Sequence, residues 1–410
     1  MSSYHVRDTC RLCGGDRLAE VLKLEPTPIP DKYLPEDRAA ESTELIPLDL
    51  FLCEDCGNLQ NGTVVDPERI YSHYLSRPAA VNPVLSSGYQ EYAQRLLDRY
   101  DIGENDLVVE MGSNDGAFLS FFKQRGSTVL GVDPAKNLAE AAVKSGIETL
   151  PTFFSSEIGL QIREDRGPAK AVIANFVYAN IDNVIDVTEG VRDLLAPDGI
   201  FSFETNYRLD VFEKDLIETI NHEHLTYYAI KSLKVFFDRL GMELIEVERV
   251  PSKGGSIRCV VQLTAGPHKV SQSVDELIEL EDRQGVYSAA FYESCANHLD
   301  RVRDAARELL AEGGGPVAGY GTSIGATMLI YQLGLGASID FLVDDDPYRQ
   351  GLLSPGYHIP VKGPQALLKE NASLALVLAP LYAQQIMEKN VAYRTQGGCF
   401  ATIWPEVQRF

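Results

Sequence analysis

The sequence has little positive charge, no long apolar run and few histidines. Lys and Arg number 37 against 59 Asp and Glu, which leaves a formal net charge of −22 at pH 7. Such a field repels phosphate and argues against a nucleic-acid or anionic-membrane surface, while a local basic pocket for a small phosphorylated ligand is still allowed. No apolar stretch is long enough to cross a bilayer, and the N-terminal residues have no apolar signal core. We therefore expect a cytoplasmic protein with reduced cysteines.

Four of the 7 cysteines form two C-x-x-C pairs in the N-terminal region, Cys10 with Cys13 and Cys53 with Cys56. Each pair can present two thiolates from one tight turn, as a tetrahedral metal site requires. In a reducing compartment this pattern indicates metal or redox chemistry before disulfides. A site with four cysteine ligands has no open position, so we predict a structural zinc, with an iron–sulfur or redox site as the alternative.

Residues 107–133 have the pattern of a nucleotide-binding β-α-β unit. We predict a buried strand over 107–111, a glycine turn over 112–116, an amphipathic helix over 117–126 and a second strand ending at Asp133, where an acidic residue can bond ribose hydroxyls. The turn lacks the G-x-G-x-x-G of dinucleotide sites, and E-x-G-S-N-D-G instead resembles motif I of S-adenosylmethionine-dependent methyltransferases. Another β-α-β unit with a glycine turn is the alternative. The resemblance places these residues near the cofactor: Gly112, Asn114, Asp115, Gly116, Asp133, Pro134 and Asn175.

The pattern on either side of this unit predicts an α/β protein of two or three domains, the number expected for 410 residues. Buried strands in 169–175 and 194–205 complete a doubly wound sheet. Two extended segments, 241–250 and 255–266, are expected as an antiparallel pair at its edge.

The last part of the chain repeats the nucleotide-binding pattern. A helical stretch over 273–315 ends in glycines, and a strand, a glycine turn, a helix and a second strand follow up to Asp346. Glycines in such a turn can cradle phosphate at a helix N-terminus. The strand ends in Asp344, Asp345 and Asp346, which can bind Mg²⁺ or form a turn before proline; we favour the turn.

Residues 218–232, ETINHEHLTYYAIKS, place two of the 7 histidines on either side of one glutamate. Three interpretations are open: a metal site, a proton-transfer site, or a polar loop with a buried histidine. The metal interpretation is the weakest, because His222 and His224 point the same way only on an extended strand, where Glu223 points the opposite way.

Taken together, the four cysteines, G-S-N-D-G, H-E-H and the G-G-S-I-R of residues 254–258 closely resemble the sugar C-methyltransferases. The resemblance runs nearly end to end. It implies a zinc-binding module over 1–75, a Rossmann-like S-adenosylmethionine domain over 76–265, and a helical linker with a second Rossmann-like domain over 266–410 that contributes to substrate binding. The implied substrate is a small nucleotide-linked keto-deoxysugar, and a monomer and a homodimer are both open.

The same resemblance assigns roles to side chains near H-E-H. Carbon methylation beside a ketone needs a base for the α-proton, and a neutral imidazole suits that task at pH 7. The resemblance makes His224 the base and Glu223 its neighbour that orients sugar or imidazole, with His222 structural. The residues that we assign to catalysis on this ground are His224, Glu223, Asn221 and Tyr74.

Four positions depart from the family pattern. Asn221 and Leu225 stand where the family commonly has tyrosine, Asn180 where it often has histidine, and Gly325 where it often has lysine. Asn221 can donate a hydrogen bond to an enolate oxygen but cannot act as a base. These changes leave cofactor binding intact. They keep two alternatives open: O- or N-methylation of another small molecule, and an inactive methyltransferase-like binding protein.

Overall fold

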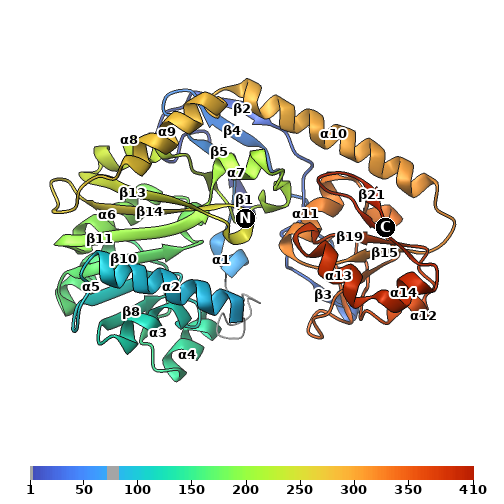
Figure 1. Cartoon of the computed structure of the whole chain (residues 1–410), viewed down its shortest axis with the longest axis horizontal. Coiled ribbons are helices and arrows are strands. Elements are labelled where there is room, and N and C mark those ends of the chain that lie inside the picture. Colours follow the sequence, from blue (N-terminus) through green and yellow to red (C-terminus); the bar gives the residue numbers. More distant parts are fainter. Residues whose placement is uncertain (1–2, 72–82) are drawn as a thin grey trace.

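The computed structural model describes residues 3–71 and 83–410, which form an α/β protein with two large sheet-containing units joined by a small N-terminal module (Figure 1). This confirms the predicted fold class. Among the described residues, no helix has the length and apolar character needed to span a membrane.

Seven strands form the larger sheet, in the order β13-β14-β11-β10-β7-β8-β9. The strands from β7 to β11 pair in parallel, and β13 and β14 form an antiparallel pair at one edge, as the sequence predicts. Their bounds are β7 (Leu107–Met111), β8 (Thr128–Val132), β9 (Thr149–Leu150), β10 (Ala169–Asn175), β11 (Leu195–Asn206), β13 (Met242–Val250) and β14 (Ser256–Leu263).

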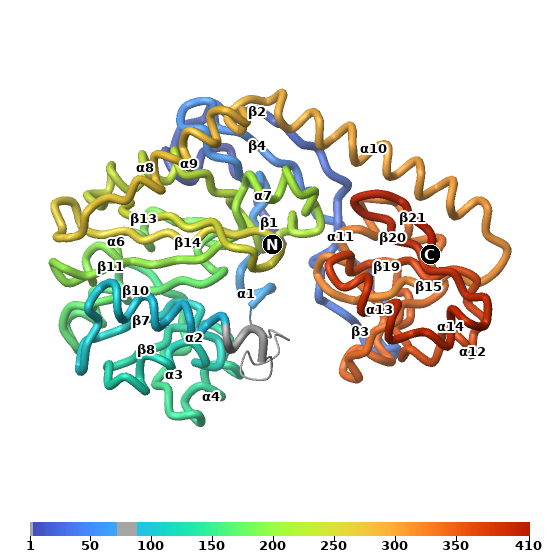
Figure 2. Tube along the Cα trace, viewed as in Figure 1, coloured from blue at the N-terminus to red at the C-terminus, as the bar shows by residue number. Residues whose placement is uncertain are grey.

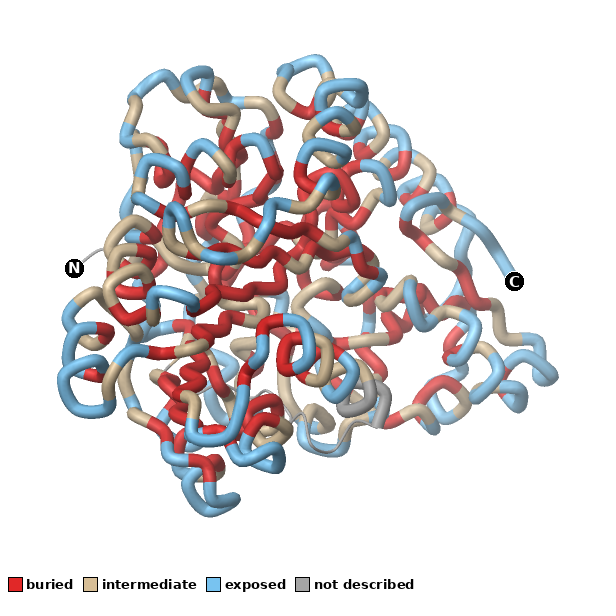
Figure 3. The backbone as a smooth tube through the Cα atoms, turned by 60° about the vertical axis from the view of Figure 1, so that its left-hand side comes forward, coloured by how far each residue is buried: buried red, intermediate tan, exposed pale blue. Residues whose placement is uncertain are grey.

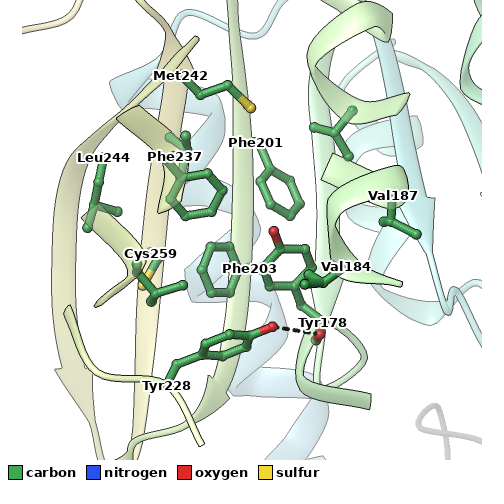
Figure 4. Close-up of a cluster of buried hydrophobic side chains, with 14 of the residues drawn as sticks. Tyr178, Val184, Val187, Phe201, Phe203, Tyr228, Phe237, Met242, Leu244 and Cys259 are labelled. Carbon is green, nitrogen blue, oxygen red and sulfur yellow. Dashed lines mark hydrogen bonds between the residues drawn. The ribbon is translucent and has the colours of Figure 1, made fainter. Parts of the chain in front are cut away.

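Both faces of this sheet are buried because successive apolar residues of each strand point to opposite sides. Val108 packs with Phe118 on one face, whereas Val109 belongs with Phe203 and Phe237 to the core on the other (Figure 4). The helices of the first face are α2 (Pro83–Arg99), α3 (Ala117–Gln124) and α4 (Lys136–Lys144). Those of the second are α5 (Ser156–Arg166), α6 (Val184–Leu194) and α8 (Ile230–Arg239).

The N-terminal module has two small antiparallel sheets. One pairs β1 (Tyr4–Val6) with β6 (Thr63–Val65). The other has the order β12-β5-β4-β2, and its strand β12 (Thr226–Tyr227) comes from the segment directly after H-E-H. The others are β2 (Leu18–Leu22), β4 (Leu50–Cys53) and β5 (Leu59–Asn61). Residues 218–232, called the histidine segment below, therefore share a sheet with the zinc module.

The C-terminal unit follows two helices, α9 (Gln272–Gln284) and α10 (Ala289–Ala311), the second of which runs across to it (Figure 1). Its sheet has the order β18-β16-β15-β19-β20-β21, parallel except for β21. The strands are β15 (Val317–Tyr320), β16 (Phe341–Val343), β18 (Val361–Lys362), β19 (Leu374–Val377), β20 (Cys399–Thr402) and β21 (Gln408–Arg409). The helices are α11 (Ile324–Gln332), α12 (Ala366–Lys369), α13 (Ala383–Lys389) and α14 (Val391–Thr395).

A segment of the N-terminal module extends to this unit (Figure 2). Strand β3 (Leu34–Pro35) pairs with β17 (Leu352–Leu353), and Gln332 exchanges two 2.9 Å hydrogen bonds with the backbone of Glu25. Buried residues are concentrated toward the centre of the molecule (Figure 3). The N-terminal module thus contacts both large units.

Candidate functional site

The four cysteines of the two C-x-x-C pairs converge at the base of the N-terminal module. Their sulfur atoms all lie within 4.8 Å of one another, with Cys10 Sγ 3.5 Å from Cys56 Sγ and Cys13 Sγ 3.6 Å from Cys53 Sγ. Four thiolates about 2.3 Å from a tetrahedral zinc ion are roughly 3.8 Å apart, so the group fits a closed zinc site. No other His, Cys, Asp or Glu group in residues 3–71 and 83–410 has this spacing, and H-E-H is not part of one.

A cavity of about 980 Å³ opens at the carboxyl ends of the central strands. Its wall includes Met111 of β7, Val132 of β8 and Asn175 of β10, and it extends to His222 and Glu223 in the histidine segment. The carboxyl edge is where ligands of open α/β sheets bind, because the loops after parallel strands meet there. Tyr74, assigned to the same pocket from the sequence, lies outside the described residues.

The glycine turn after β7 brings backbone close to the cavity. Gly112 has a φ of +67° and Gly116 one of +78°, a region that favours glycine. A Cβ atom on Gly112 would lie 2.2 Å from Val177 Cγ2, and one on Gly116 would lie 2.8 Å from Ile147 Cβ. The turn therefore requires glycine at both ends. Three of its residues, Gly112, Asn114 and Asp115, line the cavity.

Asp133 holds this turn from the end of the neighbouring strand. Its Oδ2 accepts the Asn114 N–H at 2.8 Å, and its Oδ1 accepts the Ala135 N–H at 2.9 Å. A carboxylate has about four acceptor positions, so two remain for ribose hydroxyls. Burial raises the pKa of Asp133, and the two backbone N–H groups oppose that rise. Pro134 lines the same part of the cavity.

Several buried polar atoms in the cavity wall have no hydrogen-bond partner among the described residues. They include Glu110 Oε2, Ser113 Oγ and Asn175 Oδ1. Burial raises the pKa of Glu110 well above its ordinary value. An unsatisfied buried polar group costs about 1–3 kcal/mol, so this polar wall fits a polar cofactor. No sequence pattern singles out Glu110 or Ser113 as site residues, although both belong to the E-x-G-S motif.

Within the histidine segment, the H-E-H residues form a turn and not an extended strand. Asn221 Oδ1 accepts the Glu223 N–H at 2.9 Å, and Asn221 Nδ2 donates to Thr219 O at 3.1 Å. Asn221 therefore shapes the turn with its own amide. Glu223 is 5% exposed and lines the cavity.

The two histidines bind different backbone carbonyl groups. His222 Nε2 donates to Ile46 O at 3.2 Å, its Nδ1 has no partner among the described residues, and it lines the cavity. His224 Nδ1 donates to Thr219 O at 2.8 Å, which leaves Nε2 as its basic nitrogen. Burial lowers the pKa of each imidazole to about 4, with the charge of Lys253 adding to the effect at His224. Both rings are neutral at pH 7. His224 and Asn221 are not among the described wall residues.

The tip of the β13–β14 hairpin adds a group that the sequence did not identify. Ser252 and Lys253 of the tip line the cavity, together with Arg258 of β14 and Glu204 of β11. Glu204 accepts from Ser252 Oγ and, at 2.6 Å, from Arg258 Nε. These residues meet because β14 pairs with β11, a sheet order that no local pattern in the sequence reveals.

The fold, the polar carboxyl-edge cavity and the four-cysteine centre define an S-adenosylmethionine-dependent methyltransferase with a zinc-binding module. A family model described as "C-methyltransferase C-terminal domain" matches residues 251–405. A second, "Methyltransferase domain", matches 85–247, and a third, "Putative zinc binding domain", matches 10–71. The cofactors are S-adenosylmethionine and zinc.

The chain is 33% identical to the C-methyltransferase NovU of Streptomyces niveus over 403 residues, which is 97% of this chain and 96% of that protein. It belongs to the C-methyltransferase family. Among solved structures it is similar to the CcbJ methyltransferase of Streptomyces caelestis, with 14% identity, a TM-score of 0.36, and coverage of 46% of this chain and 94% of that one. It is also similar to the magnesium protoporphyrin IX methyltransferase ChlM of Synechocystis PCC 6803, with 13% identity, a TM-score of 0.35, and coverage of 44% and 87%.

Proposed function

We propose that the protein methylates a carbon atom beside the ketone of a nucleotide-linked keto-deoxysugar. The observation that carries this proposal is one continuous cavity of about 980 Å³ whose wall includes the glycine turn and Asp133 as well as His222, Glu223 and Lys253. Ligand pockets commonly measure roughly 300–1,000 Å³, so this cavity has room for a cofactor and a second small molecule. The last three side chains are those of proton transfer and charge stabilisation.

The chemistry requires a proton acceptor next to the methyl donor. S-adenosylmethionine, when bound, supplies a methyl group on a sulfonium centre. The protein's base takes the proton from the carbon beside the ketone, and the C–H electron pair becomes an enolate. That carbon then forms a bond to the methyl carbon as the methyl–sulfur bond breaks, and the base later releases the proton to solvent. Binding both reactants in one cavity makes the transfer effectively unimolecular.

We assign the base to His224, with Glu223 and Asn221 as its neighbours. The hydrogen bond from Nδ1 to Thr219 O fixes the ring, and a neutral ring keeps a lone pair on Nε2. His222 has the same protonation state and an Nδ1 without a partner in the described part of the chain, so it is the matched comparison.

The C-terminal unit contributes, in this proposal, to binding the nucleotide. Support comes from the first turn of α11, directly after the glycine turn, which packs on the histidine segment: a Cβ atom on Gly325 would lie 3.1 Å from Cβ of Glu218. In parallel sheets the turns after the strands face ligands, so the phosphate-type turn of this unit borders the segment that carries the base.

The direct test supplies labelled S-adenosylmethionine with thymidine diphospho-4-keto-6-deoxyglucose or its uridine analogue. We expect a carbon-bound methyl group that survives acid and base and is located by NMR. A labile methyl group on oxygen or nitrogen would favour the alternative methyltransferase, and cofactor binding without turnover on any keto-sugar would favour a binding protein.

The His224→Gln variant should bind S-adenosylhomocysteine normally and lower kcat by about 10²–10⁴-fold, the usual effect of removing a general base. It should also stop exchange of the substrate's α-proton with deuterated water, measured by NMR. His222→Gln is the matched control and should retain exchange. The reverse result, exchange lost only in His222→Gln, would assign the base to His222.

A further inference from the structure

The cavity is strongly acidic, which is unusual for a site that must hold a developing anion. Eight of its lining residues are Asp or Glu, and two are Lys or Arg. One of the two cations, Arg258, is already paired with Glu204 at 2.6 Å and lies 4.1 Å from the centre of the Tyr92 ring. Its charge is therefore largely neutralised by the protein itself.

Lys253 is the other cation. Within residues 3–71 and 83–410, its ammonium group has no ion pair with a carboxylate, and it lies 3.5 Å from the centre of the Phe176 ring. Contact with an aromatic face attracts a cation without cancelling its charge. Glu204 and Glu223 are the acidic groups whose field reaches Lys253, and His224 is a neighbour whose pKa the ammonium charge depresses. The charge of Lys253 thus acts on the proposed base.

The backbone holds this lysine in an unfavourable conformation. Lys253 has a φ of +49°, and Phe176, whose ring it contacts, has a φ of +55°. Non-glycine residues adopt this left-handed region at a cost of roughly 1–3 kcal/mol, and such residues concentrate at functional sites. Two of them in contact with each other mark this corner of the cavity.

The surrounding contacts explain how the conformation is maintained. Ser252 donates to Glu204, and Lys214 Nζ donates to Gly254 O at 3.0 Å. A Cβ atom on Gly255 would lie 2.4 Å from Asp210 Cβ, so the hairpin tip packs closely against Asp210. These contacts hold the hairpin tip on both sides of Lys253, and Lys253 lines the cavity.

We propose that the Lys253 ammonium group contacts the ketone oxygen of the substrate and stabilises the negative charge that forms there when the α-proton is removed. This inference rests on the proposed function, since it concerns the same reaction. The oxygen gains charge as the C–H electron pair moves into the enolate, and it loses that charge when the carbon accepts the methyl group. A cation that the hairpin tip already holds in place stabilises such a transient anion without having to reorganise.

The acidic wall of the cavity is a second reason for a cation at this position. Without a nearby cation, an enolate among carboxylates is disfavoured by like-charge repulsion. Lys253 is exposed as a whole, but the residues packed around its ammonium group lower its pKa to about 8, with Glu204 and Glu223 opposing that shift. The ammonium form is therefore present at pH 7 and is lost as the pH rises above 8.

The test compares Lys253→Met and Lys253→Arg with Lys234→Met, which removes one charge from the exposed surface of α8, where Lys234 pairs with Asp238 at 2.8 Å. Each variant is assayed with S-adenosylmethionine and thymidine diphospho-4-keto-6-deoxyglucose or its uridine analogue, whichever the wild type methylates. The measurements are kcat and KM from pH 6 to 10, α-proton exchange in deuterated water, and S-adenosylhomocysteine affinity, which reports correct folding.

We expect Lys253→Met to lower kcat and the exchange rate by about 10²–10³-fold at unchanged cofactor affinity, as the loss of one oxyanion donor does elsewhere. Lys253→Arg should recover part of the rate and keep it above pH 8, where the wild type declines. Lys234→Met should match the wild type.

Exchange and kcat at the wild-type level in Lys253→Met would overturn the assignment, and so would a rise in KM alone, which would place the lysine on the nucleotide phosphates. If Lys253→Met loses cofactor affinity, Lys253→Gln takes its place in the same assays, and the pH profile of Lys253→Arg is also decisive. A decline of kcat above pH 8 in both Lys253→Arg and the wild type would count against the proposed role. Absence of any carbon-bound product from the wild-type protein would instead contradict the proposed function.

Discussion

Asp133 is the residue on which the shape of the cofactor end depends. Its two carboxylate oxygens each accept one backbone N–H, from Asn114 and Ala135, so the side chain positions the turn and retains acceptor capacity for a ribose. We predict that Asp133→Ala weakens S-adenosylhomocysteine binding at least tenfold in calorimetry, because a hydrogen bond to a charged group contributes roughly 1.5–3 kcal/mol. Asp304→Ala, on the exposed surface of α10, is the control. Equal affinities in the two variants would mean that the ribose is bound elsewhere.

At this scale the sequence predicts residues that share one local motif. Asp133 follows a strand and Gly112 opens a turn, and both features can be identified without knowing the sheet order. Glu204 and Lys253 escape prediction because they are brought together by the pairing of β11 with β14, between segments that are distant in the chain. The role of Asn221 is also local, since its amide bonds lie within its own turn, but a side chain that caps a turn and one that binds substrate have the same sequence signal.

Among the elements, the turn between β7 and α3 is the one in which a single methyl group should be most damaging. Gly112 combines a φ of +67° with a gap to Val177 that cannot hold a Cβ atom. We predict that Gly112→Ala lowers the melting temperature and abolishes measurable S-adenosylhomocysteine binding, because both the backbone and Val177 must shift. The left-handed conformation alone costs an alanine roughly 1–2 kcal/mol.

A second variant separates the two causes. Gly112→Ala combined with Val177→Ala removes the colliding Cγ2 atom and should recover part of the stability, whereas the backbone strain remains. Gly314→Ala is the matched control, since a Cβ atom there meets nothing within 4 Å and its φ is not in the left-handed region. A Gly112→Ala protein as stable as Gly314→Ala would show that the turn is more adaptable than its geometry indicates.

The regular elements could be predicted because they are long enough for hydrophobic periodicity to show. The antiparallel edge pair β13–β14 is such a case and is confirmed. Strand β12 is not, because two residues, Thr226 and Tyr227, cannot show an alternation. Yet this short strand attaches the histidine segment to the zinc module, so the connection between the metal site and the proposed base is visible only in the folded chain.

For the whole molecule, the zinc module is the piece that fixes the other two units and the histidine segment. Arg11, between the first two cysteines, is fully buried and donates to Leu225 O at 3.2 Å and to Asp182 at 3.0 Å. Ser232 of α8 donates to Cys56 O at 2.9 Å. On the other side, β3 and Glu25 hold the C-terminal unit. Loss of the metal should therefore loosen both connections while the large sheet stays folded.

We predict one zinc ion per chain by elemental analysis, and a loss of that ion in Cys13→Ser. The variant should keep S-adenosylhomocysteine affinity within a few-fold, because the proposed cofactor site is built on the large sheet. It should lower kcat and be less compact in small-angle X-ray scattering, because the histidine segment and the C-terminal unit lose their common support. Structural zinc sites supply folding free energy directly, so the thermal midpoint should fall as well. Cys399→Ser, which changes a cysteine of the C-terminal sheet, should leave zinc content and kcat unaltered. If Cys13→Ser retains full activity and the compact scattering profile after the metal is lost, the module does not position the site. Iron with visible charge-transfer absorption in the wild type would replace zinc by an iron centre.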